Sequence, residues 1–434
     1  MLINSKTFYK NQSYEIARYN DFFSDSLHLI NIDSNYEENN NNENVVKVKF
    51  NDLTVVENYI ENKKKFAFVV ITDLFELSED IYDFLLKIGK ILENDGKLLI
   101  TSINPKWNNI LRLFEIFKFK KNTKRRSYIN PKKINNIARS AGLELISSNT
   151  RQIFPFYIFG IGVFINKFLE LLFFYLNIGI KSYSIFRFIN TKKNKYSKTI
   201  LVPAKNEEGN LEELINRIPN FDSDYEIIII CGKSADNTLS VAHEIKIKNP
   251  EKNIKVLEQD GTGKSNAVFQ GISHSSNELI AILDSDISVD PETLTYFFKI
   301  IEDGHADFVN GTRLIYGKEK NSMRLLNVVG NLLFQAMISI VIKQKLTDSL
   351  CGTKVFKRSY LKHLNHWASS TIIKDPFGDF DFIFSAAYSG QKILEYPVHY
   401  RSRKYGSTQI SRFRDGWKLL IYFLNSLYKF NVSR

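Results

Sequence analysis

Cysteine is scarce in this sequence: Cys231 and Cys351 are the only two among 434 residues. Two thiols cannot build a four-cysteine metal site or a disulfide framework, and so low a number is typical of a reducing compartment. The sequence also lacks any uncharged apolar run of about 18 residues, and residues 1–21 contain no apolar stretch typical of a secretory leader. We therefore expect neither a membrane-spanning helix nor a leader, and a cytoplasmic location.

Basic residues outnumber acidic ones, with 59 Lys and Arg against 47 Asp and Glu, for a formal charge of +12. This excess favours acidic partners such as phosphates, nucleotides or anionic lipid. No recognition module for nucleic acid and no basic strand with interleaved aromatics is present, so no nucleic-acid partner is expected. The length predicts two domains, and 44% hydrophobic residues suffice for a core in each.

The first half of the chain alternates strand and helix patterns, which is typical of an α/β layer. Residues 66–72 (FAFVVIT) form a continuous apolar run, as in a strand buried on both faces, and residues 81–92 have apolar side chains at helical spacing. Asp95-Gly96 is predicted to be a turn, and Gly142 is predicted to end a helix over 131–141. Further strands are expected at 45–50, 97–101, 143–147 and 183–188.

A basic linker at residues 191–198 (TKKNKYSK) separates two predicted domains, 1–190 and 197–434. The second domain has the more regular α/β pattern. Its strands are expected at 199–202, 226–230, 254–257 and 278–283, and its helices at 210–217, 240–248 and 264–275. The aromatic-rich stretch 153–176 admits two interpretations, a buried or bridging helix and a segment lying in a membrane interface, and so does the basic helix expected at 413–430.

The strand at 278–283 is followed by Asp284-Ser285-Asp286, which places two carboxylates one residue apart. In an open parallel sheet, ligands bind at the carboxyl ends of the strands. Paired carboxylates with room for water suit a hard cation such as Mg²⁺ or Mn²⁺, which also holds phosphate oxygens. By itself, an Asp-x-Asp pair also occurs on solvated turns.

Three further polar segments of the second domain stand between a strand and a helix. They are 202–208 (VPAKNEE), 234–238 (SADNT) and 259–264 (QDGTGK). The last one puts glycines and Lys264 before a helix N-terminus, which is a natural cradle for phosphate. It is not a P-loop, because that motif needs a glycine at position 258, where this chain has Glu258.

These segments and the later ILDSDISVDPETL, VNGTR, DSLCGTKVFKR and GDFDF resemble family 2 glycosyltransferases, in the same order. The resemblance covers about residues 197–418, and its later segments are similar to the branch that transfers sugars to dolichyl or polyprenyl phosphate. It implies a GT-A fold, an inverting reaction and a UDP- or GDP-sugar donor. It also implies a polyprenyl-phosphate or glycan acceptor, in cell-envelope polysaccharide or lipid-linked sugar synthesis of a bacterium, at the inner face of the cell membrane.

The same resemblance assigns roles to individual residues. Asp284 and Asp286 would hold the metal, and Arg313 would meet the diphosphate or the acceptor. Pro203, Glu207 and Asp236 would line the nucleoside pocket of the nucleotide-sugar, and Lys264 would lie near the base or ribose side of this donor. Asp284 would also hold the donor's diphosphate, and a basic loop with Arg401, Arg403 and Lys404 would close over phosphate groups. Cys231-Gly232 stand where the family has acidic residues, one of which recognises the base, and a thiol cannot accept two strong hydrogen bonds. The choice between UDP and GDP therefore stays open.

The acceptor determines what Asp379 and Asp381 would do. A sugar hydroxyl needs a carboxylate to take its proton, and one of these two aspartates is the candidate. A lipid phosphate is already largely anionic, because its second pKa is about 6, and the aspartates would then only orient the substrate. In a third interpretation, Asp379 caps the helix expected at 380–388 and has no other role.

In the first domain, residues 66–76 (FAFVVITDLFE) and 94–100 (NDGKLLI) resemble the second half of class I S-adenosylmethionine methyltransferases. Ile32-Asp33 resembles the acidic end of that family's second strand. The family needs a glycine-rich turn after its first strand, yet this chain has no glycine before Gly89. The resemblance therefore implies an incomplete Rossmann-like domain, from which the first strand and the cofactor loop are deleted.

Metal-dependent glycosyl transfer by the second domain is the leading hypothesis, because it explains the ordered segments around Asp284 and Asp286. One alternative is S-adenosylmethionine-dependent methyl transfer by the first domain. The other is a basic membrane-surface binding protein that keeps an inactive scaffold, which the net charge alone suggests.

Overall fold

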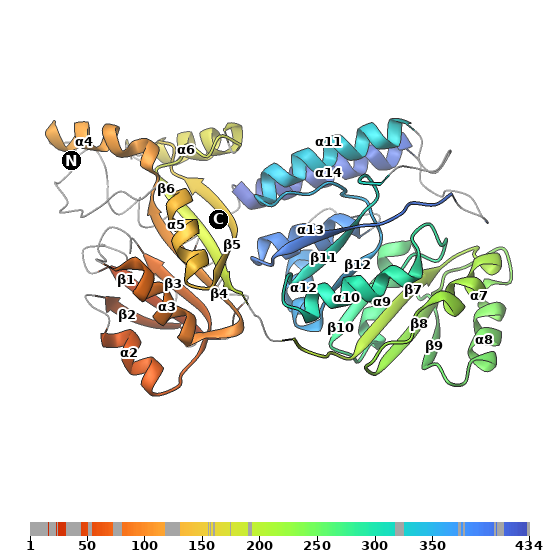
Figure 1. Ribbon diagram of the computed structural model, residues 1–434. Coiled ribbons are helices and arrows are strands. Elements are labelled where there is room, and N and C mark those ends of the chain that lie inside the picture. Colours follow the sequence, from red (N-terminus) through yellow and green to blue (C-terminus); the bar gives the residue numbers. More distant parts are fainter. Residues whose placement is uncertain are drawn as a thin grey trace. The chain divides into compact units, whose positions relative to one another are not determined.

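Figure 1 shows the computed structural model of the chain. The structure describes residues 16, 23, 25–31, 45–50, 54–72, 80–117, 131–154, 156, 158, 161–173, 175–189, 193–316, 325–371, 375, 378–402, 405 and 412–431. Asp33, Arg403 and Lys404, which the sequence singled out, lie outside these ranges. The chain divides by its internal packing into two compact units, Met1–Ile189 with Leu427–Arg434, and Asn190–Ser426. No helix within the described ranges is long and apolar enough to cross a bilayer.

The first unit is built on a six-stranded sheet with the order β2-β1-β3-β4-β6-β5. Its strands are β1 (Ser26–Asn31), β2 (Val45–Phe50), β3 (Phe66–Thr72), β4 (Leu92–Ile103), β5 (Leu143–Arg151) and β6 (Lys181–Phe188). Its helices are α2 (Thr54–Glu61), α3 (Ile81–Ile91), α4 (Asn108–Ile116), α5 (Pro131–Ser140) and α6 (Ile161–Leu172). The strands β2, β1, β3 and β4 run parallel, whereas β6 is antiparallel to both of its neighbours.

The apolar runs of the first unit form its core as expected. β3 is buried along its whole length, and α2, α3 and α5 pack against one face of the sheet through side chains such as Val56, Phe84 and Ile134. Asp95-Gly96, predicted to be a turn, lie in an irregular part of β4. Leu92 pairs with Phe66 and Lys97 with Phe68, so residues 93–96 bulge out opposite a single residue of β3. The chain turns back on itself there, because a Cβ at Gly96 would lie 3.0 Å from the Glu93 backbone.

β1 lies inside the parallel part of the first sheet. It pairs directly with β3, with Leu27 opposite Val69, and with β2 on its other side. The first unit is therefore an α/β domain with a mixed sheet, as the sequence predicts, whereas the deletion of a first strand stays a prediction.

The second unit contains a seven-stranded sheet with the order β13-β11-β12-β10-β7-β8-β9. Its strands are β7 (Lys198–Ala204), β8 (Tyr225–Cys231), β9 (Ile254–Glu258), β10 (Leu279–Ile282), β11 (Phe308–Thr312), β12 (Lys354–Lys357) and β13 (Ile393–Pro397). Its helices are α7 (Glu208–Arg217), α8 (Thr238–Lys248), α9 (Lys264–His274), α10 (Leu294–Glu302), α11 (Leu325–Ile342), α12 (Leu361–Ser370), α13 (Asp379–Tyr388) and α14 (Arg412–Asn431).

All strands of the second sheet are parallel except β12, which runs antiparallel between β10 and β11. Helices α7, α8 and α10 cover one face. On the other face, α9 approaches so closely that a Cβ at Gly271 would lie 2.8 Å from Ile230. Because β12 is antiparallel, its first residue, Lys354, lies opposite Ile282 at the end of β10. The carboxyl ends of the parallel strands and the beginning of β12 thus share one edge.

Candidate active site

Asp284 follows β10 at this shared edge and is paired with the first residue of α9. The distance from Lys264 Nζ to Asp284 Oδ1 is 2.6 Å. Gly263 takes a φ of 86°, a left-handed conformation that turns the chain into α9 and that glycine adopts without strain. The sequence predicted Lys264 near the nucleoside, whereas in the structure Lys264 is paired with Asp284, one of the two predicted metal ligands.

Gly352 closes the site from the side of β12. A Cβ at this position would overlap both Asp284 Oδ2 and Lys264 Nζ. The backbone of the segment before β12 therefore lies directly against the Asp284–Lys264 pair, and only a residue without a side chain leaves that pair in place.

Asp286 lies two residues further along the same turn and is buried. Its Oδ1 accepts a hydrogen bond from the backbone N–H of Ser288 at 3.0 Å, across Ile287, which has a φ of 51°. Ser285 donates its hydroxyl to the carbonyl oxygen of Pro203 at 3.0 Å, which ties the turn to β7. This strained turn fixes both carboxylates at the edge of the sheet.

Asp379 lies at the beginning of α13 and is bonded to Lys354, with 2.6 Å between Nζ and Oδ1. Lys354 is fully buried and also donates to the carbonyl oxygen of Cys351. Asp379 does not cap the helix. Asp375 does so, since its Oδ2 accepts from the backbone N–H groups of Phe380 and Asp381 at 2.6 and 3.1 Å. The interpretation of Asp379 as a capping residue alone is therefore wrong.

Asp381 faces a different part of the unit. Its Oδ1 accepts a hydrogen bond from the Tyr422 hydroxyl of α14, whose oxygen accepts in turn from Trp367 Nε1 of α12 at 2.8 Å. All three side chains are buried. The structure thus separates the two aspartates that the sequence treated as equivalent, and only Asp379 interacts with the ammonium groups of Lys354 and Lys264.

The charges at this edge stabilise one another. Burial lowers the pKa of Lys264, but the carboxylates of Asp284, Asp379 and Asp286 together raise it further than burial lowers it. Burial raises the pKa of Asp284, but Lys264, then Lys354 and Arg313, outweigh that effect and lower it. At neutral pH the site therefore holds charged carboxylates and charged ammonium groups side by side.

The donor set fits one kind of metal site. Among the described residues there is no group of three or more His, Cys, Asp or Glu side chains that could enclose a cation. Asp284 and Asp286 together supply carboxylate oxygens from one side only. That arrangement suits Mg²⁺ or Mn²⁺, because such ions are commonly held by one or two carboxylates and completed by water and substrate phosphates. Lys264 would share Asp284 with the cation.

Arg313, predicted to meet the diphosphate or the acceptor, is held in a buried ion pair behind the site. Its Nε and Nη2 donate to the two carboxylate oxygens of Asp348 at 2.7 and 2.9 Å, and its backbone N–H adds a third bond of 3.0 Å. Asn331 Nδ2 donates to the same carboxylate at 2.7 Å. Arg313 also stacks over the Tyr400 ring at 5.1 Å. This network fixes the segment that leads to Gly352.

The residues predicted around the nucleoside come together at the ends of β7 and β8. Glu207 immediately precedes α7, is buried, and accepts from Asn210 Nδ2 at 2.6 Å. Asp236 accepts from the backbone N–H groups of Glu208 and Thr238, each at 3.2 Å. Burial raises the pKa of Asp236, but the hydrogen bonds from Thr238 and Glu208 lower it overall. The Asp236 carboxylate, together with the Glu207 backbone N–H that donates to Thr238 Oγ1 at 3.0 Å, thus ties the β7–α7 loop to the β8–α8 loop.

Cys231-Gly232, the departure from the family pattern, lies at the end of β8. Burial, with a smaller contribution from Glu258, raises the pKa of Cys231 to about 12, so the thiol stays protonated. A Cβ at Gly232 would lie 2.8 Å from Gln259 Oε1. Gln259 donates its amide to Gly263 O and Asn266 Oδ1, each at 2.8 Å. An amide oxygen therefore lies beside the position where the family has a carboxylate.

Arg401 stands where the basic loop begins and is not directed at the carboxylate site. Its Nε and Nη2 donate to the two oxygens of Asp290 at 2.7 and 2.9 Å. Asp290 also accepts from Arg217 at 2.7 Å. The Arg401 backbone N–H donates to Ser288 O at 2.9 Å, so this end of the loop is joined to the turn that carries Asp286.

Sequence reasoning did not give a role to Asp348, Gly352, Lys354 or Gln259. The first three belong to the segment DSLCGTKVFKR, which was recognised as a block without individual roles. No pattern in the sequence shows that this segment lies beside Asp284, because only the antiparallel pairing of β12 with β10 brings the two together.

Two family models match parts of the chain. Residues 199–364 match the family model of glycosyl transferase family 2, and residues 15–148 match that of a methyltransferase domain. The chain therefore contains a family 2 glycosyl transferase domain over residues 199–364, and a methyltransferase-type domain precedes it.

Three curated relatives are similar to the second half of the chain. A low-salt glycan biosynthesis hexosyltransferase of Haloferax volcanii is 26% identical over 230 residues, 52% of this chain and 52% of the relative. A dolichol-phosphate mannosyltransferase of Pyrococcus furiosus is 32% identical over 121 residues, 27% of this chain and 34% of the relative. A dolichyl-phosphate hexose transferase of Haloferax volcanii is 27% identical over 220 residues, 50% of this chain and 88% of the relative.

The chain thus spans about half of the hexosyltransferase and a third of the mannosyltransferase that it resembles. Among solved structures, it is similar to glucosyl-3-phosphoglycerate synthase from Mycobacterium tuberculosis, crystallised with Mn²⁺, UDP and phosphoglyceric acid. The identity is 16%, the TM-score is 0.41, and the match covers 54% of this chain and 78% of that one.

The position of Gly352 generates the first prediction. Replacing it (Gly352→Ala) should displace the Asp284–Lys264 pair and abolish binding of a ligand that needs Asp284, measured by isothermal titration with nucleotide and Mn²⁺. The matched control is Gly330→Ala in α11, where a Cβ meets no atom within 4 Å. Equal binding by both variants would contradict the close approach of Gly352.

The buried pair of Asp348 and Arg313 generates the second prediction. Burial raises the pKa of Asp348, but Arg313 and Asn331 lower it to about 2, below its ordinary 3.8. Because folding lowers this pKa, the ionised Asp348 carboxylate stabilises the fold at pH values above about 4. This stabilisation of roughly 2 kcal/mol is lost as the pH falls from about 4 to about 2. At neutral pH, Asp348→Asn should cost about 3–5 kcal/mol, because it leaves Arg313 buried without a counter-charge.

Urea unfolding measures this effect as the difference in the free energy of unfolding between wild type and Asp348→Asn. The difference should be constant at neutral pH and should shrink as the pH approaches 2. The exposed Asp222, changed to Asn, provides the control and should show a difference near zero throughout. A difference for Asp348→Asn that does not change with pH would refute the assignment.

Proposed function

We propose that the second unit is an inverting, metal-dependent glycosyltransferase that moves a sugar from a nucleotide-diphosphate sugar to a polyprenyl-type lipid phosphate. The observation that supports it most directly is the arrangement of Asp284, Asp286 and Lys264 at the carboxyl edge of the mixed sheet. The relatives named above, which carry dolichyl phosphate or dolichol phosphate in their names, favour this class of acceptor.

The donor's diphosphate is the group that this edge suits. A divalent cation on Asp284 and Asp286 would neutralise the charge that develops on the departing nucleoside diphosphate. Lys264 and the N-terminus of α9 add positive charge on the same side, since the first turn of a helix carries backbone N–H groups suited to phosphate oxygens. The nucleoside would then lie toward the loops that carry Pro203, Glu207 and Asp236.

The environment of Asp379 favours a lipid phosphate over a sugar hydroxyl as the nucleophile. A hydroxyl must lose its proton to a base, and the best-placed aspartate already accepts a hydrogen bond from the buried ammonium of Lys354 at 2.6 Å. A phosphate oxygen is anionic without help and needs no base. In this proposal, Asp379 keeps Lys354 in place, and the basic residues Arg403 and Lys404 bind the acceptor phosphate.

The proposed location follows from the acceptor. Polyprenyl phosphates are membrane lipids, so the protein would work at the inner face of the cell membrane and attach to it peripherally. The product would be a lipid-linked sugar for cell-envelope polysaccharide. The first unit is proposed to have no methyl-transfer activity, because the chain has no glycine before Gly89 that could form the family's glycine-rich turn.

The third prediction concerns the donor. UDP or GDP at about 100 times its dissociation constant should raise the melting temperature by roughly 5–10 °C in the presence of Mn²⁺. Asp286→Asn should remove the shift, because the cation loses a ligand, whereas the exposed Asp222→Asn should keep it. S-adenosylhomocysteine should give no shift. A shift with S-adenosylhomocysteine alone would make the first unit the working one.

The fourth prediction concerns the acceptor. Asp379→Asn should slow transfer to a lipid phosphate less than tenfold in kcat, since no proton has to be removed. A general base in this position would instead be worth about 10²–10⁴-fold. The nucleotide shift of the same variant reports whether its fold is intact. A loss of 10²-fold or more, with the nucleotide shift retained, would show that Asp379 acts as a base on a hydroxyl acceptor.

A further inference from the structure

Helix α6 of the first unit is turned with its polar side inward. Asn166 and Glu170 are buried in the unit, whereas Phe164 and Phe168 are 75% and 65% exposed. The exposed apolar residues recur at steps of three and four, so they share one face of the helix (Ile161, Phe164, Phe168 and Leu172). The interpretation of the stretch 153–176 as a buried helix is therefore wrong for its apolar side chains.

Hydrogen bonds hold α6 in this orientation. Glu170 Oε1 accepts from the Gln152 backbone N–H at 2.6 Å and from Asn166 Nδ2 at 2.9 Å. Asn166 Oδ1 accepts from the Phe154 backbone N–H at 3.0 Å, and Glu170 Oε2 lies 3.8 Å from the buried Arg151 guanidinium. Rolling the helix to bury its phenylalanines would break these bonds and leave a buried arginine without this carboxylate. The apolar face is thus fixed on the outside.

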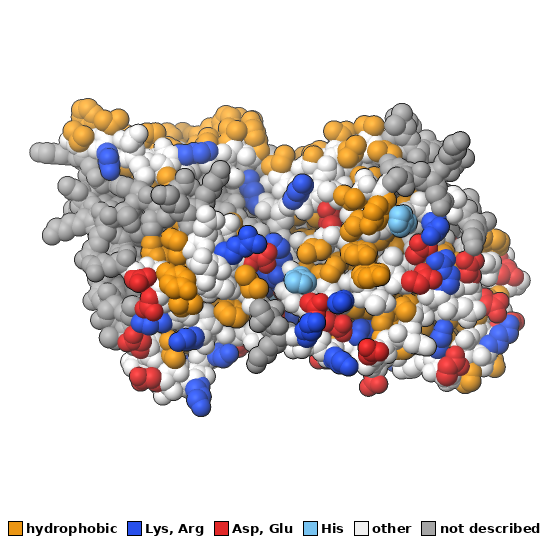
Figure 2. All heavy atoms as spheres, viewed as in Figure 1, with side chains coloured by type: hydrophobic (Ala, Val, Ile, Leu, Met, Phe, Trp, Pro, Cys, Tyr) orange, Lys and Arg blue, Asp and Glu red, His pale blue; other side chains and the backbone are white. Residues whose placement is uncertain are grey.

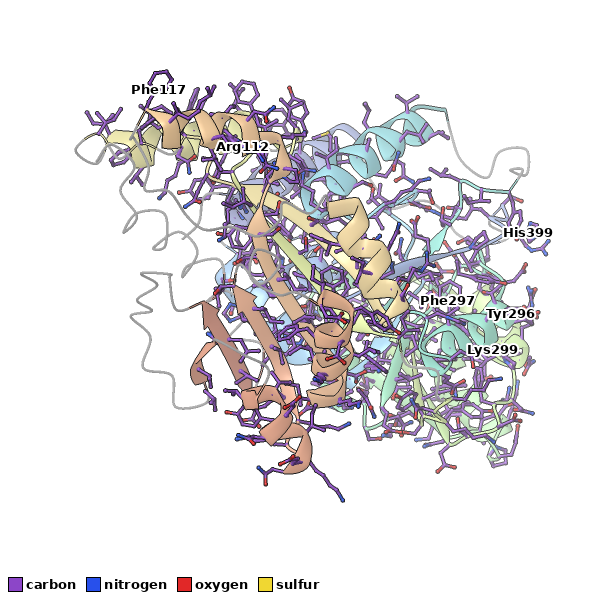
Figure 3. All side chains as sticks on the ribbon, turned by 60° about the vertical axis from the view of Figure 1, so that its left-hand side comes forward. Arg112, Phe117, Tyr296, Phe297, Lys299 and His399 are labelled. Atoms are coloured by element: carbon purple, nitrogen blue, oxygen red, sulfur yellow. The ribbon has the colours of Figure 1, made fainter. Side chains whose placement is uncertain are left out.

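Helix α4 exposes a second apolar face. Ile110, Leu113, Ile116 and Phe117 are 40% to 72% exposed. The start of α4 is tied to the segment after α6, because Trp107 Nε1 donates to Ile178 O at 2.5 Å. Figure 2 shows hydrophobic side chains gathered along the part of the first unit where α4 and α6 lie, and in Figure 3 Phe117 lies at the far end of α4, away from the sheet.

Each of the two helices carries one basic and one acidic residue, Arg112 and Glu115 in α4 and Lys167 and Glu170 in α6. Arg112 on α4 is exposed and Lys167 on α6 is half-buried, whereas the acidic side chain of α6, Glu170, points inward. In the sequence, Phe117 is followed directly by KFKKNTKRRSYIN, which has six basic residues and no acidic one. Phenylalanine and aliphatic side chains with lysine and arginine beside them are the composition of helices that lie in a membrane interface.

We infer that α4 and α6 form a docking surface for a lipid bilayer that contains anionic phospholipid. The exposed phenylalanines and aliphatic residues enter the boundary between headgroups and acyl chains, and the basic residues meet lipid phosphates. The helices lie on the bilayer and do not cross it, since α6 has only 12 residues. The surface gives the first unit a function that requires no methyl-group donor: it places the chain at the membrane.

This inference is tested by sedimentation of the full chain with vesicles. One set is made of phosphatidylcholine alone and the other of phosphatidylcholine with phosphatidylglycerol. Wild type should bind the anionic set, and the double variant Phe164→Ser, Phe168→Ser should bind at least about tenfold more weakly, because two large apolar side chains are lost. Ile247→Ser, at an isolated position on α8 that is 78% exposed, is the matched control and should bind like wild type.

A further variant separates α6 from α11, a helix of the second unit that also exposes apolar side chains. Leu332 and Leu333 of α11 are 46% and 60% exposed, and their replacement by serine should leave most vesicle binding intact. The inference would be overturned if the α11 variant lost vesicle binding and the α6 variant kept it. So would a lack of vesicle binding, or a dimer in analytical ultracentrifugation that only the α6 variant dissociates, which would identify a second copy as the occupant.

The result does not depend on the proposed sugar transfer. Vesicle binding needs neither donor nor Mn²⁺, and the α6 variant should keep the full nucleotide-dependent thermal shift. A failure of vesicle binding with the nucleotide shift intact contradicts only the docking surface. Vesicle binding without a nucleotide-dependent thermal shift would contradict only the proposed donor site.

Discussion

The buried ion pair of Asp348 and Arg313 is the interaction on which the site of the second unit depends. It fixes the short segment before β12, together with Asn331 and with Glu395, whose carboxylate accepts from the Asp348 backbone N–H at 3.0 Å. That segment brings Gly352 against Asp284 and Lys264, and Lys354 against Asp379. A buried charge pair thus helps to position the carboxylates and ammonium groups of the site.

The site is electrostatically balanced within the chain itself. Asp284 and Asp379 each have an ammonium partner, and the partners interact with more than one carboxylate. Binding a cation and a diphosphate together would preserve this balance, because the two ligands bring opposite charges. Binding either alone would upset it, which couples the two events thermodynamically.

The sequence predicted the parallel half of the second unit well, because buried strands and amphipathic helices leave clear periodicity there. It also located Asp284 and Asp286, since they follow such a strand directly. It did not predict β11, β12 and β13 or the pairing of Lys354 with Asp379. These depend on antiparallel pairing of short strands distant in sequence, which no local pattern specifies. The turn residues Asp95-Gly96 mark the bulge at which the pairing of β4 with β3 shifts, although the strand continues on both sides of it.

Asp379 and Asp381 stand on different sides of the first turn of α13, and this gives the helix two points of attachment. On one side it is bonded to Lys354 at the sheet edge, and on the other to Tyr422 of α14 and, through it, to Trp367 of α12. The α14 helix carries none of the proposed catalytic groups, yet these contacts join it to the site through one turn of α13.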